Sequence, residues 1–325
     1  MFKHRLLRSA FEEGKSRCSS DGGAMEMFSR EEAVCFLEGS WGVSNVAERL
    51  TRDRKALLHE VVTQVQVSVP FQSVTLMAVP PEQRRRPSVG SIKAECMAGV
   101  GGLCYNLNTF AWYLLKALGF SAQLCPATCT SSIIDPDNHL VVLVNDLEKK
   151  GDLHLVECGC GFPTFRAVSL DFEEESPVFV DSFLEYKYVR HEGQILRMQG
   201  DGDTIKRNDP PKKDLDFFMG KWRRFYFFSL RPSDDLSDFD AKFDRVFTVP
   251  RATPFDHSPR ALLFPGKRAV VVVNNRLMVE DEEGVLTKTV LQGDDEIAEC
   301  YRQYFPALKE EVVRAALQEW RRVQQ

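Results

Sequence analysis

The sequence lacks any long apolar run. No segment approaches the roughly 18 to 20 consecutive apolar residues that cross a membrane as a helix. It also lacks a strong excess of charge of either sign, since the formal net charge is −5 in 325 residues. Nucleic acids and membrane surfaces are bound through clustered positive charge. We therefore expect neither a nucleic acid nor a membrane as a partner.

The N-terminal segment lacks the continuous apolar stretch of a secretory signal. It is basic, as mitochondrial transit peptides are, but Glu12 and Glu13 count against that alternative. We interpret residues 1–27 as a disordered tail. Nine cysteines without a secretory signal favour free thiols in a reducing compartment, because disulfides persist mainly in secreted proteins. The sequence therefore predicts a cytoplasmic protein.

What is present is an ordinary globular composition, with 43% apolar and 27% charged residues. The first third of the chain has helical periodicity. A capping-box pattern at Ser29 opens one helix, and a second is expected over residues 52–67. After a basic loop at 84–90, a third helix begins near Cys104 and carries one apolar face as far as a C-capping Gly119.

Strand patterns dominate from residue 121 onward. Apolar runs at 139–144 and 153–157 flank a turn-forming stretch, which predicts a hairpin. Helices come first and strands second, without βαβ alternation, so the sequence predicts an α+β fold in three segments. The later elements are strands near 178–183, 222–230, 264–278 and 285–291, an exposed connection over 199–216, and helices at 294–304 and 308–322.

Cys104 lies at the predicted start of the third helix. A helix N-terminus favours the thiolate form of a cysteine, and the thiolate is the nucleophilic form. Gly101 and Gly102 allow another backbone or a ligand to come close to this point. The alternative is a buried structural cysteine, and the local pattern leaves both interpretations open.

A nucleophilic thiolate needs a base and a group that orients the base. His139 begins an apolar strand after a turn-forming stretch, and Glu157 ends the next apolar strand. If the two strands pair as a hairpin, both side chains lie near the same end of the ladder. A set of Cys104, His139 and Glu157 is then geometrically feasible.

An ordered series of motifs resembles the arylamine N-acetyltransferase family. The resemblance covers about residues 28–310, and the segments follow the family's order. They are 69–73 for Ile-Pro-Phe-Glu-Asn, 101–108 for Arg-Gly-Gly-x-Cys, 139–144 for the histidine strand, 155–161 for Val-Asp-x-Gly-Phe-Gly, and 238–255 for the later Asp-Phe-Glu and Thr-Ser-Pro-x-Ser-x-Phe run.

The resemblance implies a fold and a chemistry. The fold comprises a helical domain over 28–119, an antiparallel β-barrel over 120–230 and a C-terminal α/β lid domain over 231–325, with a papain-like cysteine triad. The chemistry is ping-pong transfer of an acetyl group from acetyl-CoA to an aromatic amine or hydrazine, carried out by a monomer without a metal.

Residue by residue, the resemblance makes Cys104 the acetylated nucleophile, His139 its base and Glu157 the counterpart of the family's aspartate. It places acetyl-CoA near the segment before His139 and near the later coenzyme loop. Arg245 and Arg251 suit CoA phosphates, because a guanidinium binds phosphate in bidentate fashion. Both can equally be surface arginines. The expected coenzyme contacts are Asn138, Arg245, Arg251 and Thr253.

Three positions depart from the family pattern. Val100 replaces the arginine of the Gly-Gly motif, which removes a charge contact. Glu157 is longer than aspartate, so the strand or the ring must shift to keep a hydrogen bond to His139. The coenzyme loop has lost its serines at 251–253, so its contacts with CoA must differ.

Three other functions fit parts of the pattern. A zinc site is one alternative, but its cysteines lack the matched Cys-x-x-Cys spacing that such sites favour. A binding protein that has lost catalysis would agree with the departures, and a thiol hydrolase would use the same triad. The ordered motifs favour the acetyltransferase. The zinc alternative would combine Cys125, Cys129, Cys158, Cys160 and His154.

Overall fold

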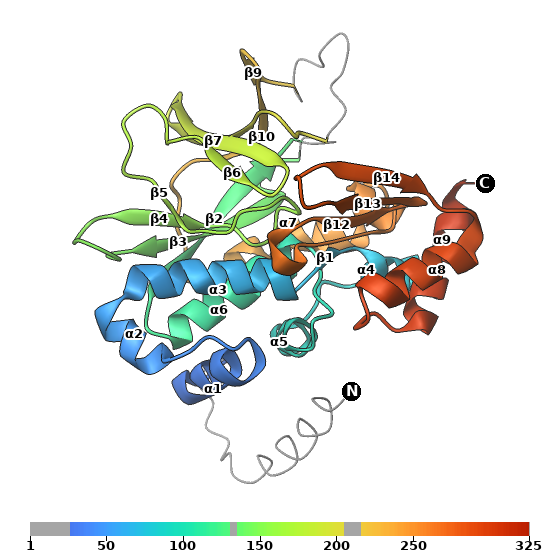
Figure 1. Ribbon diagram of the computed structural model, residues 1–325, viewed down its shortest axis with the longest axis horizontal. Helices are drawn as coiled ribbons and strands as arrows, with labels where there is room; N and C mark the ends of the chain where they lie inside the picture. The colour runs from blue at the N-terminus through green and yellow to red at the C-terminus, as the bar shows by residue number, and fades with distance from the viewer. Residues whose placement is uncertain (1–26, 131–134, 205–215, 325) are drawn as a thin grey trace.

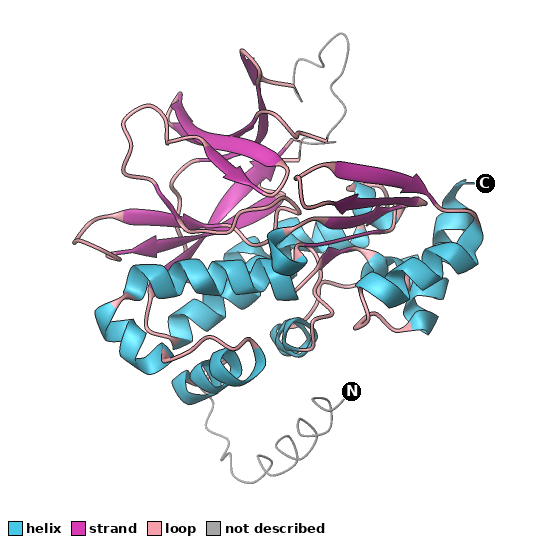
Figure 2. Cartoon of the chain, in the orientation of Figure 1, coloured by secondary structure: helices cyan, strands magenta, loops and turns pink. Residues whose placement is uncertain are grey.

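The computed structural model describes residues 27–130, 135–204 and 216–324 (Figure 1). The predicted tail lies outside the described residues except for Met27, which is buried. The predicted connection over 199–216 also lies mostly outside them. Helices and strands occupy separate regions, as Figure 2 shows, which confirms the predicted α+β class. No helix in the described part of the chain is long and apolar enough to cross a membrane.

Helices form the N-terminal region and pack around a shared apolar core. They are α1 (Arg30–Ser40), α2 (Val46–Arg52), α3 (Arg54–Ser68), α5 (Val89–Met97) and α6 (Cys104–Ala117). Ser29 caps α1 by accepting a hydrogen bond from the backbone N–H of Glu32 at 3.1 Å, as the capping box predicts. Pro70 follows α3, and Gly119 with a φ of +83° follows α6, so both helices end where the sequence predicts.

The sequence does not predict α5, because residues 84–90 have the composition of a loop. Ser88 caps the helix, because its hydroxyl accepts a hydrogen bond from the backbone N–H of Ser91 at 3.1 Å. Its first turn contains Gly90, a weak helix former. Only Ile92 and Cys96 are buried, so the apolar stripe is too short to stand out.

One antiparallel sheet curls into a half-barrel above α3 and α6 (Figure 1). Its strands are β2 (Ser121–Cys129), β3 (His139–Asn145), β4 (Leu153–Val156), β5 (Val168–Ser169), β6 (Phe179–Asp181), β7 (Leu184–His191), β8 (Gln194–Gln199), β9 (Phe218–Met219) and β10 (Trp222–Phe228). The order is β5-β4-β3-β2-β10-β8-β7-β6, with β9 beside β10. Among the described strands the ladder does not close between β5 and β6, so the predicted barrel is an open, curled sheet.

The sequence predicts one of two hairpins in this sheet and not the other. The predicted β3–β4 hairpin is confirmed, with Val142 opposite Val156. The β7–β8 hairpin is not predicted. Its turn is Glu192-Gly193, where both residues have positive φ, and a glycine between two alternating runs was the available signal.

A second sheet has the order β1-β11-β12-β13-β14, and α8 and α9 pack with it at the C-terminal end (Figure 1). Phe71 pairs with Leu262, so this sheet ties the N-terminal region to the C-terminal one. Within the predicted strand region 264–278, the β-branched run forms a strand over 270–273, and Asn274 with a φ of +56° makes a turn to the next strand, which begins at Arg276. The sequence also does not predict α7. The elements are β1 (Phe71–Gln72), α4 (Val74–Met77), α7 (Asp240–Thr248), β11 (Arg260–Leu263), β12 (Val270–Val273), β13 (Arg276–Glu280), β14 (Leu286–Val290), α8 (Gly293–Tyr304) and α9 (Glu310–Gln324).

Candidate active site

Cys104 is the first residue of α6, and the glycines before it fix its position. The backbone N–H of Gly102 donates to the carbonyl oxygen of Pro70 at 3.2 Å, and the N–H of Gln72 donates to the carbonyl of Gly102 at 2.9 Å. A Cβ at Gly101, whose φ is +72°, would lie 1.9 Å from the Pro70 oxygen. The close backbone approach predicted at Gly101-Gly102 is therefore confirmed.

His139 and Glu157 meet as the hairpin predicts. His139 begins β3, Glu157 follows β4, and the His139 Nε2 lies 2.6 Å from the Glu157 Oε2. The Glu157 side chain is fully buried, and that of His139 is 5% exposed. The backbone N–H of Gly159 donates to the other oxygen of Glu157 at 2.7 Å. The longer arm of glutamate therefore keeps the hydrogen bond that an aspartate would make.

Asn108 supports this pair from α6, and the sequence assigns it no role. Its Nδ2 donates to Glu157 Oε1 at 2.9 Å and to the carbonyl of Leu140 at 2.7 Å. Its Oδ1 accepts from the backbone N–H of Cys158 at 2.9 Å. One amide thus ties the Cys104 helix to both strands of the hairpin. The available signal was an asparagine next to Leu107, at the edge of the apolar face of the predicted helix.

Burial and charge act in opposite directions on the buried pair. Burial lowers the pKa of His139, but the Glu157 carboxylate and the adjacent Cys104 side chain outweigh it and hold that pKa well above its ordinary value. Burial raises the pKa of Glu157, but the charge and the hydrogen bond of His139 outweigh it and leave that pKa lowered. Both shifts favour the imidazolium–carboxylate form of the pair, with Cys104 beside the ring.

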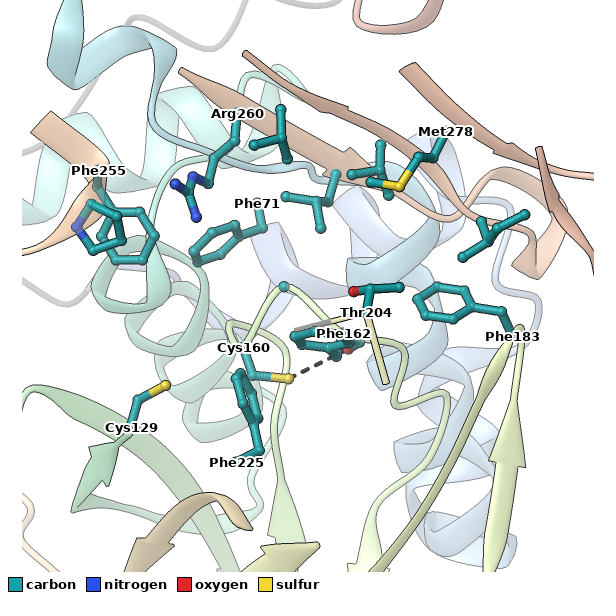
Figure 3. A pocket seen from close by; sticks show the side chains of 16 residues that line it. Phe71, Cys129, Cys160, Phe162, Phe183, Thr204, Phe225, Phe255, Arg260 and Met278 are labelled. Carbon is teal, nitrogen blue, oxygen red and sulfur yellow. Dashed lines mark hydrogen bonds between the residues drawn. The ribbon is translucent and has the colours of Figure 1, made fainter. Parts of the chain in front are cut away.

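Two cavities that share a wall lie beside the triad. A small cavity of about 50 Å³ is lined by both Cys104 and His139. A larger one of about 320 Å³ lies next to it and is lined mainly by apolar and aromatic side chains (Figure 3). Gly159 lets the segment that follows β4 approach α6 here, since a Cβ on it would lie 2.8 Å from the Cα of Cys104. The residues that line both cavities are Phe71, Cys129, Cys160, Pro254 and Phe255.

Two of the four expected coenzyme residues border the small cavity. Asn138 and Thr253 both line it. The Asn138 side chain also holds β2, because its Oδ1 accepts from the backbone N–H of Cys129 at 2.8 Å and its Nδ2 donates to the Cys129 carbonyl at 3.1 Å. Thr253 is buried, and its hydroxyl accepts a hydrogen bond from the N–H of Phe255 at 3.4 Å.

The two expected arginines do not line that cavity. Arg245, on α7, forms an ion pair with Asp135 at 3.3 Å. Arg251 lies in a turn with a φ of +60° and borders a different cavity of about 330 Å³. That cavity is also lined by Arg84 and Arg322. Asn138 and Thr253 therefore line the cavity of Cys104 and His139, and neither arginine does.

The side chains of the alternative zinc site do not converge in the described residues. His154 lies instead with Glu148 and Asp152 at the turn between β3 and β4, within 4.8 Å of both. Cys125 and Cys158 are buried, and burial raises the pKa of each thiol. The described geometry gives this alternative no support.

A model of the N-acetyltransferase family matches residues 56–311, a range that includes Cys104, His139 and Glu157. The chain belongs to this family. The predicted resemblance to the arylamine N-acetyltransferases is thereby confirmed, and the protein is an acyltransferase. Val100, which stands where the family motif has arginine, packs against the apolar core of the C-terminal region.

Solved structures of arylamine N-acetyltransferases share the fold. The enzyme of Nocardia farcinica aligns with a TM-score of 0.69 and 18% identity, over 89% of this chain and 94% of that chain. The enzyme of Mycobacterium abscessus gives 0.69 and 16%, over 93% and 99%. The enzyme of Mycobacterium marinum in complex with CoA gives 0.64 and 16%, over 81% and 92%. No curated protein sequence matches the chain.

Proposed function

We propose that this family member transfers an acetyl group from acetyl-CoA to an aromatic amine or hydrazine through an acetylated Cys104. The observation that carries the proposal is the convergence of Cys104 and His139 on one small cavity, with the ring of His139 held by the buried Glu157 at 2.6 Å. A nucleophile, a base and an orienting acid are the parts that acyl transfer requires. The family supports acetyl-CoA as the donor.

In the first half-reaction the Cys104 thiolate attacks the carbonyl carbon of the acetyl thioester. The bond between that carbon and the CoA sulfur breaks, and the His139 imidazolium gives its proton to the departing sulfur. Glu157 keeps the ring oriented and stabilises its charged form. Backbone N–H groups at the start of α6 are suited to stabilise the oxyanion that forms.

In the second half-reaction the amine nitrogen attacks the acetyl carbon on Cys104. His139 takes the proton that the nitrogen loses, and Cys104 leaves as the thiolate, which restores the enzyme. The larger cavity suits an aromatic acceptor because its lining is apolar and its volume of about 320 Å³ falls in the range of small-molecule sites. The acceptor in the larger cavity reaches the acetyl group on Cys104 where the two cavities adjoin.

For the coenzyme we propose contacts of two kinds. Asn138 and Thr253 border the cavity of Cys104 and are placed to contact the thioester end of CoA. Arg251 borders a cavity that also has Arg84 on its wall, and Arg245 is largely exposed, so these residues suit the phosphate end. The proposal includes a monomeric, cytoplasmic enzyme that uses no metal.

The proposal is tested by mixing the purified protein with acetyl-CoA and measuring its intact mass. We expect one added acetyl group in the wild type, loss of that group when an aromatic amine is added, and no adduct in Cys104→Ala. Cys160→Ala is the matched control, because Cys160 lines the same cavity and is expected to keep the adduct. A folded wild type that never gains the adduct would favour the non-catalytic binding protein.

A further inference from the structure

The larger cavity contains one charged side chain in an otherwise neutral wall. Its described lining includes no aspartate and no glutamate, and Arg260 is its single ionised residue. Figure 3 shows the guanidinium of Arg260 beside the rings of Phe71 and Phe255. Its central carbon lies 5.3 Å from the centroid of the Phe255 ring, a distance at which a cation is attracted to an aromatic face.

Arg260 has no anionic partner among the described residues. Its Nε donates to the backbone carbonyl of Ser258 at 3.3 Å, and no described group accepts from its two terminal nitrogens. Burial lowers its pKa to about 10, which indicates a cation without compensating charge. Tyr301, the titratable group that opposes this shift, is neutral at physiological pH. Arg260 is partly buried, and an unpaired guanidinium in an apolar, partly desolvated site favours a ligand of opposite charge.

The place of Arg260 limits what that ligand is. Phe71 and Phe255, which flank the guanidinium, also line the cavity of Cys104, so the anion binds near the reacting end of the site. The phosphates of CoA are separated from its thioester by the whole pantetheine arm, so they do not suit this position. A carboxylate suits it, because a carboxylate accepts two parallel hydrogen bonds from the free edge of a guanidinium.

We propose that the acceptor of this enzyme is an aromatic amine that carries a carboxylate, and that Arg260 binds this carboxylate while the ring occupies the apolar cavity. The inference rests on the proposed acetyl transfer. Arg260 acts as a specificity-determining residue, since the chemistry at Cys104 does not require it. A neutral arylamine would fill the same cavity and leave the guanidinium unpaired.

The test compares aminobenzoates with the matching aminobenzamides, which have the same shape but no charge. In the wild type we expect kcat/KM to be about 10- to 100-fold higher for the best aminobenzoate isomer than for its amide, as a charged hydrogen bond implies. Arg260→Met should remove that preference, mainly through KM, and change kcat/KM for the amide by less than about twofold. Arg260→Lys should restore part of it, because it keeps the charge but not the bidentate edge.

Controls separate the outcomes. Arg276→Met removes an exposed arginine from the same sheet and should leave the preference intact. Calorimetric binding of the aminobenzoate to unacylated protein should weaken by the same factor in Arg260→Met, even if no acetyl transfer occurs. Thermal unfolding should confirm that Arg260→Met is folded.

Two results would overturn the inference. Equal kcat/KM for acid and amide in the wild type, or equal losses for both in Arg260→Met, would mean that Arg260 recognises no carboxylate on the acceptor. A preference for succinyl-CoA over acetyl-CoA that disappears in Arg260→Met would move the carboxylate to the acyl donor. Failure of the acetyl adduct at Cys104 would instead remove the proposed function and leave the binding measurement to decide the role of Arg260.

Discussion

The triad and the larger cavity lie side by side but differ in how their polar groups are partnered. On the triad side, Glu157 accepts hydrogen bonds from His139, Asn108 and Gly159, and its charge is compensated. On the cavity side, Arg260 keeps two nitrogens without a described partner in an apolar lining. The protein itself therefore completes the catalytic geometry, whereas the cavity leaves one charge for a ligand to pair.

His139→Ala should have the largest effect, because it removes the base from the fully partnered side. We expect acetyl transfer to fall by about 10³-fold or more, as for other triad members. Alkylation of Cys104 by iodoacetamide at neutral pH should slow as well, because the imidazolium beside the sulfur is lost. The matched control is His154→Ala, a buried histidine of β4 that does not line either cavity. Equal alkylation rates for wild type and His139→Ala would contradict the pairing.

Gly101→Ala should have the largest structural effect. The new Cβ would lie 1.9 Å from the Pro70 carbonyl oxygen, and no flexible side chain can move to relieve the contact. We expect a loss of at least about 3 kcal/mol in the free energy of unfolding, measured by urea denaturation. Gly119→Ala is the control, since that glycine also has a positive φ but no atom within 4 Å of the added carbon. Its cost should be about 1 kcal/mol, from backbone conformation alone. Similar costs at both sites would show that the contact to Pro70 is not tight.

Glu157→Gln should come next, with a cost that depends on pH. Because folding raises the pKa of His139, this residue contributes fully to the free energy of unfolding below the ordinary histidine pKa of 6.5. That contribution is lost as the pH rises through the raised pKa. Because folding lowers the pKa of Glu157, this residue contributes fully to the free energy of unfolding above the ordinary glutamate pKa of 4.5. That contribution is lost as the pH falls through the lowered pKa. Both residues therefore contribute fully to stability only between pH 4.5 and pH 6.5.

We expect Glu157→Gln to cost about 3 kcal/mol of unfolding free energy in that window, as for other broken buried pairs. The cost should shrink toward high pH, where the wild-type pair loses its imidazolium. Activity should fall further than stability does, because the neutral amide no longer stabilises the charged ring. A cost that is constant from pH 5 to pH 10 would mean that the pair is not ionic. Unfolding of the variant at room temperature would give Glu157 a mainly structural role.

The same comparison explains how much of the site was predictable. Cys104, His139 and Glu157 could be chosen from the sequence because each lies at the end of a strongly patterned element, where direction and proximity follow from the element itself. The α+β order followed from the change of periodicity near residue 121. Asn108 lies within the same helix, but its bond to Glu157 crosses to another strand, which the helical pattern does not encode.

The features of the site and fold that the sequence did not predict depend on contacts between distant parts of the chain. Arg260 gains its role only because β11 pairs with β1, which brings it to the wall beside Phe71. Arg245 and Arg251 were chosen for their chemistry, and the sequence did not indicate that Asp135 pairs with Arg245. Whether the large sheet closes also depends on which strands become neighbours, so the predicted barrel was too regular.

Met278→Ala should have the smallest effect on the free energy of unfolding. It tests how tightly the wall of the larger cavity is packed. Met278 lines the larger cavity and is only partly buried, so truncation enlarges a space that already exists. We expect less than about 1 kcal/mol of lost unfolding free energy, against about 2 to 4 kcal/mol for Met77→Ala, which removes a fully buried methionine. KM for the acceptor should rise because ring contacts are lost. If both methionines cost the same, the cavity wall is packed like the core, and the contrast with the triad lies in its charges alone.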